Sequence, residues 1–315
     1  MANFYGQYIG FGAGVSGAVF QGWGESYGYA HQGYVGSGDE TNDKFSLASG
    51  TQNGTATVTL SVARSPCGSS SSATHGYQHG GRTGGAGTET DIIDRFDFSS
   101  DSSSSDVGDL FRVMMFEGGT MSTTHGYTHG GYIPDAPQNF IEKYAHASSA
   151  TSEDIGDLVG ATYLPASAMS STKGYSMGGV PSGGYSHNSI QSYLYASDGN
   201  ATDVSDMSTG HTTGSGTNSD TSGYCAGGDG NAANSTDVII DKFSFASDGD
   251  GGSNIGNLSV ARSITAGVSS KTFGYCVGGA TTSNVIDKYD FSSDGSASDV
   301  GDISTGDECW GGHQV

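Results

Sequence analysis

Residues 74–110 read THGYQHGGRTGGAGTETDIIDRFDFSSDSSSSDVGDL, and the order of features in this stretch decides the fold. A Gly-Tyr pair leads into a Gly-Gly pair, an alternating apolar segment follows, and a turn of Asp and Ser residues precedes a last short apolar segment. Alternation with a period of two predicts a half-buried strand, and Asp and Ser favour turns because their side chains bond the local backbone. The stretch and the residues before it therefore predict a unit of four strands: Ser65–Ser72, Thr74–Gly80, Asp91–Phe98 and Asp106–Leu110.

The same order of features recurs six times along the chain. Six Gly-Tyr pairs place their tyrosines 48 to 51 residues apart, and five of the pairs lead into Gly-Gly. Each pair is followed by a motif resembling Ile-Asp-Lys-Phe and, 14 or 15 residues after the aromatic of that motif, by an apolar residue: Leu60, Leu110, Leu158, Met207, Leu258 and Ile303. Four strands repeated at about 49 residues are typical of a propeller blade. We expect an all-β chain that forms one six-bladed β-propeller of four-stranded antiparallel blades.

The composition agrees with this expectation and excludes several other classes. The 315 residues include 54 glycines and only 14% charged residues, with a formal net charge of -22. Glycine at this frequency excludes an ordinary helical protein, because each glycine costs a helix interior about 1 kcal/mol relative to alanine. Recurring aromatic residues and a hydrophobic content of 34% argue against a disordered chain. A nucleic-acid binder would need a basic surface, and no apolar run reaches the roughly 20 residues that span a bilayer.

The ends of the chain bear on how the ring closes. Met1–Gly14 lacks the basic and apolar regions of a secretory signal. The 27 residues before the first Gly-Tyr pair exceed the roughly 14 residues of the equivalent stretch in an internal copy, so Met1–Gly14 is surplus to the repeat. A propeller must close its ring, and the first and last segments of a chain often share one blade. We expect residues 15–315 to form the propeller and Met1–Gly14 to be an arm or the closing strand. The other candidate for the closing strand is Cys309–Val315.

Several copies of the repeat carry an order of residues found in a known family. Gly278-Gly279 ends a predicted strand, Tyr289-Asp290 follows a variable loop, and Val300–Ile303 lies in a predicted fourth strand; in two copies an arginine follows that strand, at Arg64 and Arg262. This order resembles the kelch repeat, although Val-Gly-Asp-Leu stands where kelch repeats usually carry a Trp. The combination is similar to kelch-like proteins encoded by tailed bacteriophages of marine bacteria. That resemblance implies a virion, tail or fibre component.

Three histidines at one repeat position raise the hypothesis of a metal site. The residue two positions after the repeat tyrosine is histidine in the first three copies, at His31, His79 and His129. If that strand lined the propeller axis, the three rings would converge on a metal such as Zn²⁺ or Ni²⁺, which accept nitrogen ligands. The alternative is that repeat duplication copied a packing residue whose ring bonds a neighbouring backbone carbonyl.

Aspartates five positions apart recur in the predicted hairpins. The pairs are Asp101 and Asp106, Asp198 and Asp203, and Asp294 and Asp299. Several carboxylate oxygens on one turn predict a Ca²⁺ site. The alternative is that these residues bond their own backbone in turns and keep the blade edges polar.

The cysteines and the motif content bear on catalysis. Cys67, Cys225, Cys276 and Cys309 form no Cys-x-x-Cys spacing, and we expect free, mostly buried thiols because equivalent places in adjacent blades lie too far apart for a disulfide. No hydrolase, zinc-protease or phosphate-loop motif occurs, so we expect a protein that is not an enzyme. Some kelch propellers are copper oxidases that use Tyr, Cys and His, and this resemblance makes such an oxidase the second alternative.

The loops that follow each Gly-Gly pair vary most, and loops on rigid scaffolds carry function. Tyrosines can stack on sugar rings, while Asn and Asp supply hydrogen bonds, so we expect ligand contacts from Tyr132, Tyr185, Asn188, Asp229, Asn231 and Asn284. The leading prediction is a non-enzymatic tail-fibre or decoration protein of a virion, made in the host cytoplasm without a signal peptide. Its expected partners are other virion proteins, further copies of itself, and a host-surface glycan or protein, with no nucleic acid and no membrane insertion. The first alternative is a bacterial extracellular propeller that binds glycans.

Overall fold

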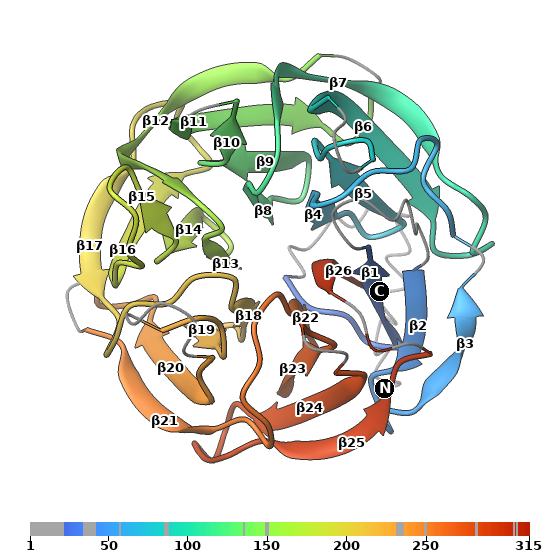
Figure 1. Cartoon of the computed structure of the whole chain (residues 1–315), viewed down its shortest axis with the longest axis vertical. Coiled ribbons are helices and arrows are strands. Elements are labelled where there is room, and N and C mark those ends of the chain that lie inside the picture. The colour runs from blue at the N-terminus through green and yellow to red at the C-terminus, as the bar shows by residue number, and fades with distance from the viewer. Residues whose placement is uncertain are drawn as a thin grey trace, which may run out of the picture.

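The computed structural model describes residues 22–33, 42–56, 58–84, 88–134, 136–148, 151–230, 236–248, 251–280, 283–304, 306 and 308–315. These residues form strands, turns and bends without any helix. Six antiparallel sheets stand around a common axis like the blades of a propeller (Figure 1). The predicted fold class, an all-β propeller of six four-stranded blades, is confirmed.

Four strands make up each blade, and we number the blades in chain order from the one that contains β1. The inner strands of blades 1 to 6, next to the axis, are β26 (Cys309–Gln314), β4 (Gly68–Ser71), β8 (Gly118–Met121), β13 (Ala166–Met169), β18 (Ser215–Asn218) and β22 (Ala266–Ser269). The second strands are β1 (Tyr27–Gln32), β5 (His75–His79), β9 (His125–His129), β14 (Lys173–Met177), β19 (Ser222–Ala226) and β23 (Phe273–Val277). The third strands are β2 (Asn42–Ser46), β6 (Thr90–Asp97), β11 (Ala136–Ala145), β16 (Ser189–Leu194), β20 (Ile239–Ser244) and β24 (Val285–Asp290). The outermost strands are β3 (Gln52–Ala56), β7 (Ser105–Met114), β12 (Glu153–Tyr163), β17 (Thr202–Asp206), β21 (Ser253–Asn257) and β25 (Ser298–Asp302).

Two short strands extend blade 3. β10 (Tyr132–Ile133) pairs with β11, and β15 (Val180–Pro181), from the following repeat, pairs with the end of β12. These additions lie where the loops between second and third strands begin, so they hold those loops against the sheet.

Blade 1 is built from both ends of the chain. β26 pairs with β1 in a register that sets Tyr29 opposite His313. Cys309–Gln314 therefore supplies the closing strand, and Met1–Gly14 lies outside the described residues. In blade 2, strands β4 to β7 fall at the four segments expected from the repeat.

The Gly-Tyr pair of each repeat joins one blade to the next. In blade 5, the ring of Tyr224 lies 5.9 Å from the ring of Tyr289 and stacks at 4.6 Å on Phe291, both of which belong to blade 6. The same contact closes the ring, where Tyr275 of blade 6 packs at 5.6 Å against Phe45 of blade 1. Each tyrosine thus inserts among apolar residues of its neighbour, a contact worth about 0.5–1.5 kcal/mol beyond the area that it buries.

The glycine before each tyrosine makes room for an aromatic ring of its own blade. A Cβ atom at Gly76 would overlap the ring of Phe96, and one at Gly223 would overlap the ring of Phe243. A side chain at this position would push the third-strand aromatic out of the space between blades. This explains why Gly and Tyr recur together.

The second residue of the motif that resembles Ile-Asp-Lys-Phe, an acid in five blades and Gln191 in blade 4, ties each blade to the one before it. The Asp94 carboxylate accepts a hydrogen bond from the Ser61 N–H at 2.8 Å, and the Asp287 carboxylate accepts one from the Ser259 N–H at 2.9 Å. Corresponding bonds occur in the other four blades, through Asp43, Glu142, Gln191 and Asp241. Arg64, which belongs to the kelch-like pattern, is buried and binds Asp94 at 2.8 Å. It therefore acts as an interior anchor.

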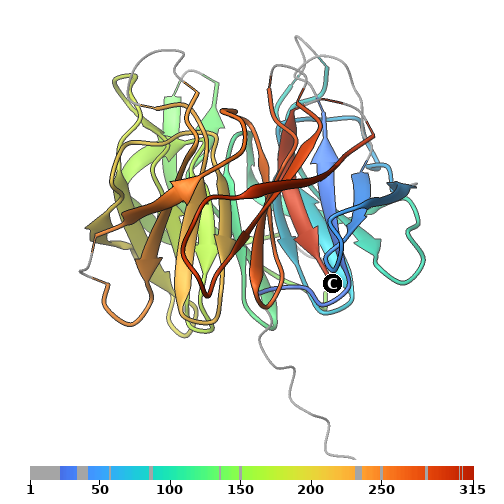
Figure 2. The same cartoon turned by 90° about the horizontal axis from the view of Figure 1, so that it is seen from below.

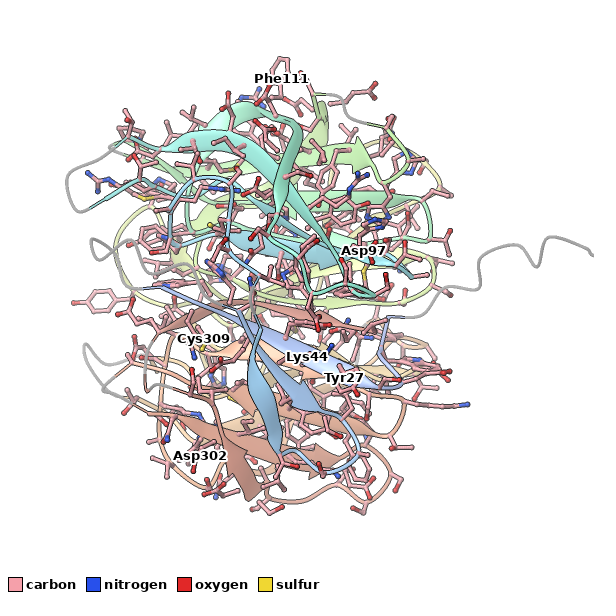
Figure 3. The ribbon with its side chains drawn as sticks, turned by 90° about the vertical axis from the view of Figure 1, so that its right-hand side faces the viewer. Tyr27, Lys44, Asp97, Phe111, Asp302 and Cys309 are labelled. Carbon is pink, nitrogen blue, oxygen red and sulfur yellow. The ribbon has the colours of Figure 1, made fainter. Side chains whose placement is uncertain are left out.

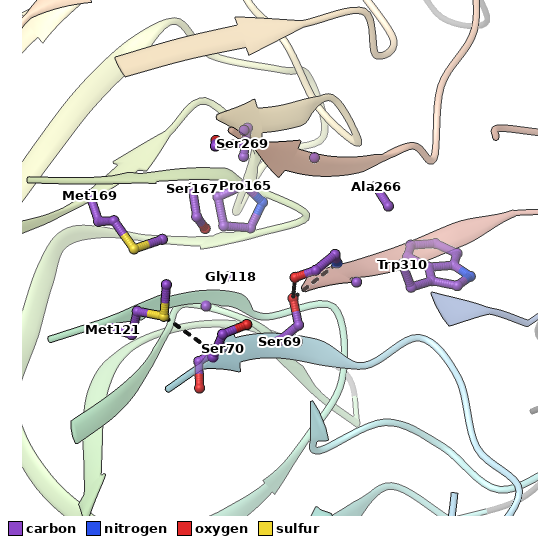
Figure 4. A pocket seen from close by; sticks show the side chains of 18 of the residues that line it. Ser69, Ser70, Gly118, Met121, Pro165, Ser167, Met169, Ala266, Ser269 and Trp310 are labelled. Carbon is purple, nitrogen blue, oxygen red and sulfur yellow. Dashed lines mark hydrogen bonds between the residues drawn. The ribbon is translucent and has the colours of Figure 1, made fainter. Parts of the chain in front are cut away.

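The inner strands approach one another closely around the axis. A Cβ atom at Gly119 would overlap the Ser69 carbonyl oxygen, and Gly216, Gly267 and Gly312 are constrained in the same way by the preceding inner strand. What remains at the axis is a cavity of about 100 Å³, lined by small polar residues such as Ser69 and Ser167 and by Met121 and Met169 (Figure 4). Close approach of backbones accounts for much of the glycine along the inner strands.

The propeller has two different faces. One face carries the hairpins that join first to second and third to fourth strands, and we call it the hairpin face; the C-terminus lies there (Figure 2). The opposite face carries the loops between second and third strands and the crossings from one blade to the next, and we call it the loop face. Every loop that was expected to bind ligand opens on the loop face.

Candidate functional site

The predicted ligand residues are spread over four blades. Tyr132 begins β10 in blade 3, and Tyr185, in blade 4, is 66% exposed. Asn188 donates its side-chain N–H to the Met207 carbonyl at 3.2 Å, which makes it part of the blade 4 framework. Asp229 pairs through its backbone with Thr212, and the backbone carbonyl of Asn284 accepts the Ile303 N–H. Asn231 lies outside the described residues. The structure does not gather these residues into one site.

Tyr132 is the exception, because it stands in a group of four half-buried aromatic side chains on the loop face. Its ring lies 5.1 Å from that of Tyr163, Tyr163 lies 6.1 Å from Phe116, and Phe116 lies 5.5 Å from Trp310, all between ring centroids. We call these four residues the aromatic row. The row runs from the loop of blade 3 to the inner strand of blade 1, at the mouth of the axis.

The row breaks the repeat. Where blade 3 has Tyr132 after its Gly-Gly pair, the four other blades with that pair have Arg82, Val180, Asp229 and Ala280. The position of Phe116, just before the inner strand, holds Leu164 in blade 4 and Thr213 in blade 5. Sequence reasoning found Tyr132 but missed Phe116, Tyr163 and Trp310, because it looked for function in the loops and not in the crossings between blades.

A chain of backbone hydrogen bonds surrounds the mouth of the axis. The N–H of Leu164 donates to the carbonyl of Phe116 at 2.8 Å, Thr213 donates to Leu164 at 3.1 Å, and Ile264 donates to Thr213 at 2.8 Å. Cys309 completes the run by donating to Ile264 at 3.0 Å. Each crossing is thereby tied to the one before it.

Four residues that take part in these backbone hydrogen bonds around the mouth have an unusual backbone conformation. The φ angles of Phe116, Leu164, Thr213 and Ile264 are 61°, 58°, 59° and 58°. For a residue with a side chain this left-handed conformation costs roughly 1–2 kcal/mol, and it persists only where surrounding contacts hold it. Together with Trp310, these side chains line a cavity of about 50 Å³, which we call the mouth cavity.

The three histidines of the metal hypothesis do not converge. His31, His79 and His129 lie on the second strands of blades 1, 2 and 3, so an inner strand separates each of them from the axis. His79 lies 3.3 Å from Glu117, whereas His129 lies between the hydroxyls of Tyr193 at 3.1 Å and Ser167 at 3.2 Å. Over the part of the chain that the structure describes, no three His, Cys, Asp or Glu residues come close enough to hold a metal ion.

The electrostatics of these histidines agree with a packing role. All three are fully buried, and burial lowers the pKa of His31 and of His129 to about 3. His129 also packs edge-on against Tyr193 of the next blade, with 5.7 Å between ring centroids. A buried, neutral ring packed against an aromatic ring fits a packing residue, but the polar partners of His129 are the hydroxyls of Tyr193 and Ser167 and not the backbone carbonyl that the alternative predicted.

The hairpin aspartates are used inside the molecule. Lys44 binds Asp101 at 2.7 Å, Lys143 binds Asp198 at 2.8 Å and Lys242 binds Asp294 at 2.7 Å, each lysine reaching from the preceding blade. The second member of two pairs makes a turn, because Asp106 and Asp299 each accept the N–H of the glycine two residues on, at 3.1 Å. These contacts favour the turn interpretation over the Ca²⁺ hypothesis.

None of the four cysteines forms a disulfide, and all four are buried, as expected. Burial raises the pKa of the Cys67 thiol to about 12, so this thiol is protonated at neutral pH. Protonated, enclosed thiols are poor nucleophiles and poor metal ligands. They fit a role in packing.

Exposed apolar residues also lie on the rim of the propeller. Phe111, on β7, is 57% exposed, and Val159, on β12, is 62% exposed (Figure 3). Serine occupies the corresponding position in the other four blades. Both side chains lie on outermost strands, away from the axis, and Val113, two residues after Phe111 on β7, is exposed as well.

Comparison with known proteins leaves the geometry as the main guide to function. Neither a protein-family model nor a curated protein matches the sequence. None of the described segments is a helix long and apolar enough to cross a membrane.

Proposed function

We propose that the chain is a non-enzymatic binding propeller. Its loop face would attach the particle or cell that carries the propeller to another surface. The observation that carries this proposal is the aromatic row at the mouth of the axis. The four rings of the row are only partly buried, and the apolar area that they leave in water costs about 25 cal/mol per Å². A contiguous group of such rings typically marks a binding surface.

The contrast between the two faces supports attachment through the loop face. On the hairpin face, five blades repeat one turn, in which a serine hydroxyl accepts the N–H three residues on: Ser72, Ser122, Ser170, Ser219 and Ser270. The loops on the opposite face differ from blade to blade in length and composition. Variation on a rigid scaffold is what recognition requires, whereas a uniform face suits contact with a fixed partner.

The carrier that we propose is the virion of a tailed bacteriophage, in which the chain serves as a tail-fibre or decoration component. This step rests on the resemblance of the repeat to kelch-like proteins of marine phages. The hairpin face would then contact other virion proteins, and the loop face would contact a glycan or protein of the host surface. A bacterial extracellular propeller that binds glycans would use the same row on a different carrier.

Two experiments test this proposal. Fluorescently labelled propeller is expected to bind bacterial cells, and the Tyr163→Ala variant is expected to bind them at least tenfold more weakly. Binding that is equal for both proteins, or absent for both, would contradict attachment through the row. Antibodies against the propeller should label tailed particles in electron micrographs; label on bacterial envelopes instead would favour the extracellular alternative.

A further inference from the structure

We infer that the aromatic row and the mouth cavity together bind a neutral sugar that carries an N-acetyl group. This inference rests on the proposed function, because it names the ligand of the same surface. It goes beyond that proposal by assigning Phe116, Tyr163 and Trp310, together with Tyr132, to one subsite.

The row suits the face of a sugar ring. Its four rings follow one another at 5.1, 6.1 and 5.5 Å, and neighbouring rings are inclined by 62°, 52° and 57°, so ring faces and ring edges alternate along the row. The C–H groups of a pyranose ring pack on the faces of aromatic rings, while its hydroxyls remain free to bond polar groups at the edges. The hydroxyls of Tyr132 and Tyr163 are available for this, because neither has a hydrogen-bond partner among the residues that the structure describes.

The rings are held in place before any ligand arrives. The indole N–H of Trp310 donates to the Gly33 carbonyl at 2.7 Å. Tyr132 exchanges two backbone hydrogen bonds with Met115, at 2.7 and 3.1 Å. Phe116 is fixed by its left-handed backbone and by the bond from Leu164. A site ordered in advance loses little conformational entropy on binding, which favours affinity.

The mouth cavity supplies the selectivity for an acetyl group. It adjoins Phe116 and Trp310, and its other apolar walls come from Leu164, Pro165 and Ile264. Its volume of about 50 Å³ is several times the roughly 10–15 Å³ of comparable space that one water molecule needs. The cavity therefore has room for an acetyl group. An acetamido substituent on a sugar that lies along the row would enter it.

Charge selects against acidic sugars. The chain carries a formal net charge of -22, and Glu117 belongs to the wall of the mouth cavity. A surface of one sign of charge lowers the local concentration of ligands of the same sign. Sugar acids are therefore disfavoured, and a neutral N-acetylated sugar remains.

The test compares three tetrasaccharides: β-1,4-linked N-acetylglucosamine, the unacetylated glucose analogue, and galacturonate. Binding is followed by tryptophan fluorescence in a Trp23→Phe background, which leaves Trp310 as the single tryptophan, because the chain has two. We expect saturable binding of the N-acetylated sugar and at least tenfold weaker binding of the other two. Equal affinities for the first two sugars, or no binding of the N-acetylated sugar, would overturn the inference.

Three variants connect binding to the row. Phe116→Gly removes one ring and also relieves a left-handed backbone that glycine adopts freely, so its folding should survive while sugar binding falls at least tenfold. Tyr163→Ala should weaken binding similarly. The matched control is Tyr185→Ala, which removes a tyrosine of the same face that is 66% exposed and lies outside the row. Affinity unchanged in Phe116→Gly, or reduced equally in Tyr185→Ala, would refute the assignment of the site.

Failure of this inference can be told apart from failure of the proposed function. If labelled propeller binds cells through the row but no tetrasaccharide binds, attachment stands and the ligand is a protein or another glycan. If the N-acetylated sugar binds but no cell does, the sugar site stands and attachment fails.

Discussion

Acidification should unfold this propeller through its buried histidines. Burial lowers the pKa of His31, His129 and His313 to about 3, and that of His146 to about 4. Neighbouring histidines add to the effect in each case, because a second positive charge would repel the first. In the unfolded chain the same residues titrate near pH 6.5. Below that pH the unfolded state therefore binds more protons than the folded state, and the free energy of unfolding falls as the pH falls.

The size of the effect follows from the pKa differences. Each histidine costs about 1.4 kcal/mol per pH unit between its unfolded and folded pKa values. At pH 5 this amounts to about 2 kcal/mol for each of the four, or about 8 kcal/mol together. Domains are commonly stable by about 5–15 kcal/mol, so the loss is comparable to the whole stability of the fold.

Urea denaturation at pH 7 and pH 5, followed by circular dichroism, measures this loss. The decisive variant is His129→Met, because blade 4 itself carries Met177 at this position. The quantity compared is the fall in unfolding free energy between the two pH values, which removes any constant cost of the substitution. We expect that fall to shrink by about 2 kcal/mol in the variant. His125→Ser, which copies Ser222 of blade 5 at a partly exposed site, should change it much less.

An equal fall in wild type and His129→Met would refute the reasoning. It would mean that His129 takes up a proton within the fold, and therefore that the space between the blades admits water or rearranges. If His125→Ser reduced the fall in unfolding free energy as much as His129→Met does, the reasoning would also be refuted, since burial would then not distinguish the two histidines.

Three further predictions concern the framework of the propeller. Gly119→Ala should cost about 1–3 kcal/mol in urea denaturation because its Cβ would overlap the Ser69 carbonyl, whereas Gly160→Ala, which has open space around it, should be close to neutral; equal effects would contradict the close approach of the inner strands. Arg64→Met should cost about 3–5 kcal/mol, because it leaves Asp94 buried without its ion pair, and a loss below 1 kcal/mol would show that water reaches this carboxylate. The four cysteines should stay unreactive toward a thiol reagent in the native protein and all react once it is unfolded; fast reaction of any one of them would contradict its burial.

The fold could be predicted because the repeated residues occupy the positions at which a propeller tolerates the fewest residue types. A glycine beside a buried ring and a tyrosine between two blades recur in all six blades, and the side chain that accepts a backbone N–H is an acid in five blades and Gln191 in blade 4. Ring closure was harder, since either end of the chain was long enough to add a strand. The pair Gly311-Gly312 was the available signal, because the inner strands require small residues where their backbones meet.

The candidate site could be predicted only in part, for a physical reason. Tyr132 stands in a loop that the repeat exposes, but Phe116 and Tyr163 stand at crossings between blades, and Trp310 stands on the closing strand. These residues come close together only because the closed ring places their blades around one axis. A local sequence pattern contains no information about that arrangement. The metal hypothesis failed to find support for the same reason: one position in three repeats means three similar places, and in a ring such places are kept apart.

The left-handed residues at the mouth of the axis have side chains where glycine would fit without strain. Glycine would adopt this conformation without strain, and glycine is the commonest way this chain solves that problem elsewhere, as at Gly130 and Gly227. At the mouth, four successive blades instead keep Phe116, Leu164, Thr213 and Ile264, at a cost of roughly 1–2 kcal/mol each. Side chains kept at that cost must contribute something in return. Leu164 and Ile264 contribute walls to the mouth cavity, whereas Phe116 lines that cavity and also belongs to the aromatic row. Replacing Phe116 by glycine should therefore weaken binding, while relief of the left-handed strain, about 1–2 kcal/mol, offsets part of the packing that the fold loses with the ring.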